Sequence, residues 1–107
     1  MTLDKNKSAV IPLEEAIEFT HASQSRNPNA TKSFFAGSNK LTRILEQEGC
    51  IGIRIYNGYD SEADRTNLVL VGVNESGEDM TDGVIVEKLI PCPHVCPKSS
   101  PLIIDIP

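Results

Sequence analysis

Two apolar stretches with a period of two residues most constrain how this 107-residue chain can fold. In CIGIRIYNGYD, Ile51, Ile53 and Ile55 alternate with other residues, which is the pattern of a half-buried strand. In NLVLVGVNESG both alternating sets are apolar, which is typical of a central strand covered on both faces. The polar segment between them has the length of a hairpin loop, so we expect these strands to pair antiparallel.

Helical patterns precede the two strands. Pro12 suits a first helical turn, and the apolar spacing after it predicts a helix over residues 12–24. A second helix is expected with Ser38 as its cap and Gly49 in the left-handed position after its end. Phe34 and Phe35 are expected to belong to an earlier turn of this second helix and to anchor the core.

Five of the seven prolines lie between residues 91 and 107. Such a segment cannot be a helix or a central strand, although its apolar end, from Leu102 to Ile106, is expected to lie extended against the body or a partner. Residues 84–86 are a candidate third strand. The expected fold is a single α+β domain over residues 10–107, with two N-terminal helices packed on a small antiparallel sheet and an extended proline-rich closing segment at 91–107. Residues 1–9 are expected to form a flexible arm.

The charge balance excludes some classes of partner. Fifteen acidic and ten basic residues give a net charge of -5, which argues against nonspecific binding to nucleic acid or anionic lipid. No segment approaches the roughly 20 apolar residues of a membrane span. The chain is therefore expected to be soluble and cytoplasmic, without a membrane partner. A cytosol would keep its three cysteines reduced, so a disulfide framework is not expected. The spacing of Cys92 and Cys96 permits a disulfide between them, but nothing in the sequence requires it.

The segment PCPHVCP could carry chemistry through Cys92, His94 and Cys96. With Cys50 as a fourth ligand these residues would form a zinc site, although a strong zinc pattern has two paired knuckles and this chain has one. Alternatively, Cys92 or Cys96 would act as a nucleophile with His94 as base, but no helix follows to lower a thiol pKa. The preferred interpretation is a stiff closing segment, with no cofactor expected and zinc as the alternative.

Arg54 and Tyr56 share one face of the first predicted strand. They are the candidate binding residues, and the alternative is a solvated sheet face with cross-strand pairing. The acidic cluster in GEDMTDG, Glu78, Asp79 and Asp82, is interpreted as a solvated turn.

Three segments, ILEQEGCIGIRIYNGYD, NLVLVGVNESGEDM and CPHVC, carry a resemblance. In this order the chain resembles a group of short bacterial proteins with G-C-x-G-I-R-I-Y, L-V-L-V-G-V and a C-terminal Cys-Pro segment, over roughly its last two thirds. The resemblance brings no activity or catalytic residue with it. It implies a bacterial cytoplasmic origin and one structural unit for Cys50, Arg54, Tyr56, Cys92 and Cys96.

We predict a nonenzymatic protein-binding or assembly module, which contacts a protein partner or a second copy through the face around Arg54 and Tyr56 or through the apolar tail. Pairing of sheet edges into a homodimer would be one form of it. The alternatives are a zinc-stabilised module using Cys50, Cys92, His94 and Cys96, and a small thiol-dependent enzyme.

Overall fold

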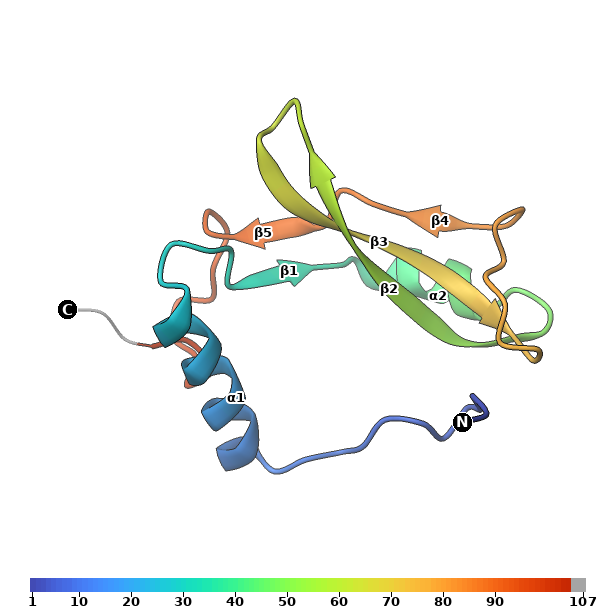
Figure 1. Cartoon of the computed structure of the whole chain (residues 1–107), viewed down its shortest axis with the longest axis horizontal. Coiled ribbons are helices and arrows are strands. Elements are labelled where there is room, and N and C mark those ends of the chain that lie inside the picture. Colours follow the sequence, from blue (N-terminus) through green and yellow to red (C-terminus); the bar gives the residue numbers. More distant parts are fainter. Residues whose placement is uncertain (105–107) are drawn as a thin grey trace. The chain divides into compact units, whose positions relative to one another are not determined.

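The computed structural model describes residues 1–104 and contains two helices and five strands (Figure 1). The elements, in chain order, are α1 (Leu13–Arg26), β1 (Ser33–Phe35), α2 (Ser38–Leu45), β2 (Cys50–Asp60), β3 (Arg65–Asn74), β4 (Ile85–Val86) and β5 (Ile90–Cys92). The chain forms two compact units. Unit 1 comprises Met1–Lys7 and Phe35–Ile90, and unit 2 comprises Ser8–Phe34 and the described part of Pro91–Pro107.

Unit 1 is built on a three-stranded antiparallel sheet in the order β2-β3-β4. Strands β2 and β3 form the long twisted hairpin of Figure 1, with paired residues from Asp60 and Arg65 to Cys50 and Asn74. The two strands, their antiparallel pairing and the central position of β3 are therefore confirmed. The predicted third strand is also present, as the short β4.

The apolar core of unit 1 lies between this sheet and α2. Ile44 of α2 is fully buried and packs with Leu70 of β3 and Val86 of β4. A Cβ at Gly72 would come within 2.8 Å of Gln47 Nε2 and 3.1 Å of Cys50 Sγ, so the glycine lets these side chains pack closely on β3. Gly49 has φ +83°, which confirms the predicted left-handed residue between α2 and β2.

Unit 2 contains α1 and the C-terminal segment. Helix α1 begins after the extended Pro12, with Glu14 and Glu15 in its first turn, where the helix dipole favours negative charge. Its one buried side chain is Gln24. The amide of Gln24 donates to the Leu102 carbonyl at 3.0 Å and accepts from the Ile104 N–H at 2.9 Å, which holds the C-terminal segment against α1.

Strands β1 and β5 form a separate two-stranded sheet, and their arrows run in opposite directions in Figure 1. The Lys32 N–H donates to the Cys92 carbonyl at 2.7 Å and extends this pairing. Cys92 is also joined by a disulfide to Cys96, with a Cα–Cα distance of 4.8 Å.

The predicted arrangement of two helices on one sheet with an extended closing segment is wrong. The strands form two sheets, and α1 belongs to the unit without the three-stranded sheet. The closing segment supplies β5 and then a disulfide-closed turn. Pro91 is tolerated in β5 because an edge strand does not need every N–H for pairing. What remains of the prediction is the coarse α+β content.

The aromatic pair before α2 was also placed wrongly. Phe34 and Phe35 lie in β1, and Phe35 is 66% exposed rather than a core anchor. The N-cap of α2 is Gly37, so Ser38 is the first helical residue.

The predicted contact of Ile106 lies outside the described residues.

The proposed domain bounds, an arm over residues 1–9 and one domain over residues 10–107, stay a prediction. The two compact units do not decide them, because a compact unit need not fold independently. Among residues 1–104, no helix has the length and apolar content required to cross a membrane.

Candidate functional site

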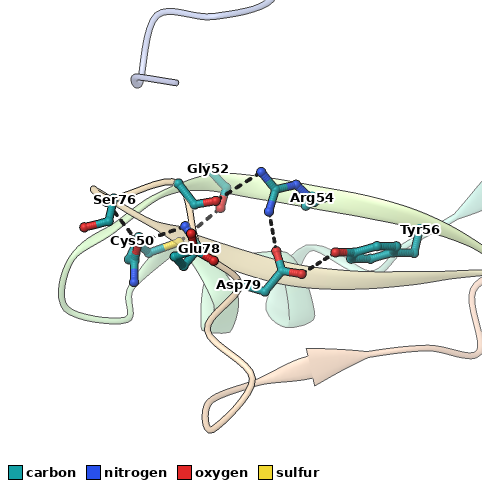
Figure 2. A network of polar contacts seen from close by, with 9 residues as sticks. Cys50, Gly52, Arg54, Tyr56, Ser76, Glu78 and Asp79 are labelled. Carbon is teal, nitrogen blue, oxygen red and sulfur yellow. Dashed lines mark hydrogen bonds and ion pairs between the residues drawn. The ribbon is translucent and has the colours of Figure 1, made fainter. Parts of the chain in front are cut away.

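The two predicted binding residues of β2 hold one carboxylate of unit 1 between them. Arg54 Nη1 donates to Asp79 Oδ1 at 2.5 Å, and the Tyr56 hydroxyl donates to the other carboxylate oxygen (Figure 2). Arg54 Nη2 also donates to the Gly77 carbonyl at 3.3 Å. We call Arg54, Tyr56 and Asp79 the strap.

The strap crosses the middle strand of the sheet. Asp79 is bridged to Val73 on the edge of β3 opposite β2, so the side chains of Arg54 and Tyr56 reach across β3 to meet it. Arg54 is the direct partner of Val71, which is 3% exposed. The strap therefore lies over the face of the sheet opposite α2 and helps to exclude water from the valines of β3.

The turn that carries Asp79 is fixed by its own backbone contacts. Asn74 Oδ1 accepts from the N–H groups of Ser76 and Glu78 at 2.9 and 3.0 Å. The Met80 N–H donates to the Gly72 carbonyl at 2.8 Å, which fastens the returning chain to β3. The carboxylate of Asp79 is thus presented by an ordered turn and is engaged by the strap, whereas Glu78 and Asp82 are exposed, as the solvated-turn interpretation expects.

The hydrogen bonds of the strap shift the acid–base equilibria of its members. The hydrogen bond from Tyr56, followed by that from Arg54, lowers the pKa of Asp79 below its ordinary value, although desolvation acts the other way. The same carboxylate raises the pKa of Tyr56, chiefly through their hydrogen bond. Its hydrogen bond also raises the pKa of Arg54. At neutral pH the strap is therefore an ion pair with a neutral tyrosine.

Strand β2 has one paired edge and one outer edge. Among residues 1–104, β2 pairs with β3 alone, from Cys50 to Asp60, with a register shift between Cys50 and Gly52. Ile55 and Tyr59 project from this strand and are each 60% exposed. The Tyr59 hydroxyl donates to Asp64 in the hairpin turn. An unpaired strand edge with exposed apolar side chains is a surface that can accept another strand.

The structure does not bring the four predicted zinc ligands together. Cys50 lies in unit 1, where its thiol donates to the Gly52 carbonyl at 3.2 Å, whereas Cys92, His94 and Cys96 lie in unit 2. The implied common unit for Cys50, Arg54, Tyr56, Cys92 and Cys96 is therefore not observed.

The disulfide contradicts the expectation of three reduced cysteines, and in this form neither Cys92 nor Cys96 is a thiolate that can bind a metal or attack a substrate. Within the described chain there is no cluster of three or more metal-binding side chains. The zinc site and the thiol enzyme stay predictions for the reduced chain.

Unit 2 has an open cleft of about 740 Å³ between α1 and the C-terminal segment. Ile17, His21 and Lys98 line it, together with Ser99, Pro101 and Ile104. Nε2 of His21 is engaged by the Pro101 carbonyl at 2.9 Å, so one polar group of the lining already serves to hold the segment. The predicted contact of the apolar tail is thus with α1.

Comparisons with protein-family models, with curated proteins and with solved structures found no match. Arg54, Tyr56 and the outer edge of β2 are therefore the features from which a function can be inferred. The sequence identified Arg54 and Tyr56 by their shared strand face, but it did not identify Asp79. The signal that could have found Asp79 is the turn sequence Asn74-Glu75-Ser76-Gly77, which returns the chain to the edge of β3.

Proposed function

We propose that this chain is a nonenzymatic assembly module that associates with a second copy by pairing the outer edges of two β2 strands. The observation that carries the proposal is the outer edge of β2, a strand of 11 residues with a register shift between Cys50 and Gly52, along which no other strand lies within residues 1–104. Backbone N–H and C=O groups along such an edge are ready to form a ladder with another chain.

The charge pattern of β2 supports this assignment. Proteins protect exposed edges with charged side chains, and Arg54 is the one charged residue of β2 before Asp60 at its end. Asp79 draws the guanidinium of Arg54 across β3, away from the outer edge. The residue that would otherwise block pairing is therefore held where it does not interfere.

The side chains near the centre of β2 favour the same use. Ile55 is 60% exposed, and pairing with a second copy would remove part of its apolar surface from water. An aliphatic or aromatic cross-strand pair contributes roughly 0.2–1 kcal/mol beyond alanine. Such a pair would add to the backbone hydrogen bonds of the ladder between the two copies.

The oligomeric state tests the proposal. We expect a mass of two chains by light scattering after size-exclusion chromatography, with dissociation on dilution. Ile55→Lys places a charge at the centre of the edge and should yield a monomer with unchanged circular dichroism, because Ile55 lies outside the core. Ile85→Lys is the matched control, since Ile85 is 51% exposed on β4, and it should leave the dimer intact. A native chain that stays monomeric at millimolar concentration would overturn the proposal.

A further inference from the structure

The disulfide of unit 2 joins a buried cysteine to an exposed one. Cys92 lies in β5 and is 1% exposed, whereas Cys96 lies in the exposed turn that follows this strand. A thiolate opens a disulfide by attacking one sulfur and expelling the other, so access decides which sulfur is attacked. We propose that Cys96 is a site of reversible thiol–disulfide exchange with small thiols, and that Cys92 is the leaving group and restores the disulfide.

Cys92 is held in place by contacts other than the disulfide. Its strand pairs with β1, and its carbonyl accepts from the Lys32 N–H at 2.7 Å. An incoming thiolate would reach the sulfur of Cys92 only after a local opening of this segment. Burial therefore protects Cys92 from direct attack, both in the disulfide and as a free thiol.

The turn that contains Cys96 lacks this protection. Every residue from 93 to 99 is exposed, and Val95 is 67% exposed. A freely diffusing thiol can reach this turn without unfolding the chain, because its approach needs only exposed surface. The chemical class of the co-reactant is therefore a small thiol such as glutathione.

The exchange consists of two balanced steps. In the first, the thiolate of the small thiol attacks Cys96 Sγ and forms a mixed disulfide with it, while the bond to Cys92 breaks and Cys92 leaves as a thiolate that takes a proton from water. In the second, another small thiolate attacks the small-molecule sulfur of the mixed disulfide and releases the thiolate of Cys96. Two small thiols are thus oxidised to one disulfide, and the protein disulfide is reduced to two thiols.

The turn keeps the two sulfurs close after the bond has opened. The Val95 N–H donates to the Pro91 carbonyl at 3.1 Å, so this turn is also closed by a backbone hydrogen bond. The Cα–Cα distance of Cys92 and Cys96 is 4.8 Å, which lies within the range that a disulfide spans. Cys92 can therefore attack Cys96 Sγ in the mixed disulfide and expel the small thiol, which restores the original bond.

Exchange at this site does not require global unfolding. The two cysteines are four positions apart in the sequence, and a disulfide across so short a loop removes less chain entropy than one across a long loop. Both cysteines belong to unit 2, whereas the apolar core around Ile44 belongs to unit 1. The exchange therefore modifies the closing segment and leaves the core of unit 1 intact.

Mapping of the mixed disulfide in the native chain tests the proposal. The oxidised full-length chain is incubated with millimolar reduced glutathione, quenched in acid and alkylated with N-ethylmaleimide, and the modified positions are assigned by tandem mass spectrometry. We expect glutathione on Cys96 and the alkyl group on Cys92. The same chain in concentrated urea is the control, because both sulfurs are then accessible and glutathione should be found on either cysteine.

Two single-thiol variants provide a matched comparison that does not require the intermediate to be trapped. In a Cys50→Ser background, Cys92→Ser leaves the thiol of Cys96, and Cys96→Ser leaves the thiol of Cys92. The thiol of Cys96 should react with a chromogenic disulfide reagent at least about tenfold faster than that of Cys92, because a buried thiol reacts only when its segment opens. In urea the two rates should agree.

The outcomes separate the attacked sulfur from the exchange itself. Glutathione on Cys96 of the native chain, together with the faster reaction of the Cys96 thiol, supports the proposal. Glutathione on Cys92, or equally on both cysteines of the native chain, overturns the assignment of the attacked sulfur. A native disulfide that stays intact in glutathione, while the chain in urea reacts, overturns the exchange. Should a single-thiol variant fail to fold, the mapping in the native chain decides.

Discussion

Unit 1 buries Ile44, Leu70 and Val86 around an apolar core, whereas the side chains that unit 2 buries within the described residues are those of Gln24 and Cys92. The first unit is therefore stabilised mainly by removal of apolar surface from water. The second depends on a covalent link and on hydrogen bonds from a side-chain amide to the backbone.

This difference follows from the local sequences. The segment from Ile51 to Val73 supplies aliphatic residues with regular alternation, so a sheet and one helix are enough to enclose a core. Helix α1 has Phe19 on its exposed side, and the C-terminal segment is interrupted by prolines. Segments that cannot build a core require cross-links or specific polar contacts to become ordered.

The largest expected effect comes from removing the centre of the core. Ile44→Ala should lower the free energy of unfolding of unit 1 by about 2–5 kcal/mol, because it deletes a fully buried side chain and leaves a cavity. Hydrogen exchange measured residue by residue should show lower protection in β3 and unchanged protection at the Ile104 N–H. Leu45→Ala is the control, since Leu45 is 52% exposed. Equal loss of protection in both units would show that the two are not energetically distinct.

Reduction of the disulfide should produce the reverse pattern. The short loop between Cys92 and Cys96 predicts a loss of about 2 kcal/mol on the chain-entropy estimate. We expect faster exchange at the Ile104 and Lys32 N–H groups, with β3 unaffected. The measurement is hydrogen exchange with and without a phosphine reductant, with a Cys92→Ser, Cys96→Ser double variant as the control for the reductant itself. Unchanged protection in unit 2 would mean that its polar contacts suffice.

A smaller effect is expected from acidifying the strap. Because the folded state lowers the pKa of Asp79, its contribution to stability is present above the ordinary carboxyl pKa near 3.9 and is lost as the pH falls through the lower folded value. Asp79→Asn should flatten this part of the pH dependence of the urea midpoint. Tyr56 has a raised pKa, so its contribution is fully present below about pH 10 and is lost only at higher pH. An unchanged acid limb in Asp79→Asn would contradict the assigned role of the carboxylate.

The local sequence pattern was sufficient to predict the hairpin of β2 and β3, but it was not sufficient to predict several of the other elements. The alternation around Ile53 and in LVLVGV specifies strand type and face, and Gly49 marks a chain reversal by its own conformational freedom. Strand β1 has no such signal, because its order depends on pairing with β5, more than fifty residues later. Phe35 was misplaced for that reason.

The candidate site was predictable to a similar degree. Arg54 and Tyr56 could be placed on one face because a strand has a period of two. Their shared partner could not be placed, since Asp79 reaches them only after the chain has turned at Asn74 and paired again with β3. The disulfide of Cys92 and Cys96 was not predicted, because the spacing of two cysteines does not decide between a disulfide, metal ligands and free thiols.

The amide of Gln24 recognises the C-terminal segment by its main chain. Because the Ile104 N–H is required for that contact, a proline is excluded at position 104 even though prolines are frequent in the segment. The N–H groups of Val95, Leu102 and Ile103 also donate hydrogen bonds. The segment therefore contains positions that accept proline and positions whose backbone N–H donates a hydrogen bond. Substitution by proline is excluded at the second kind of position.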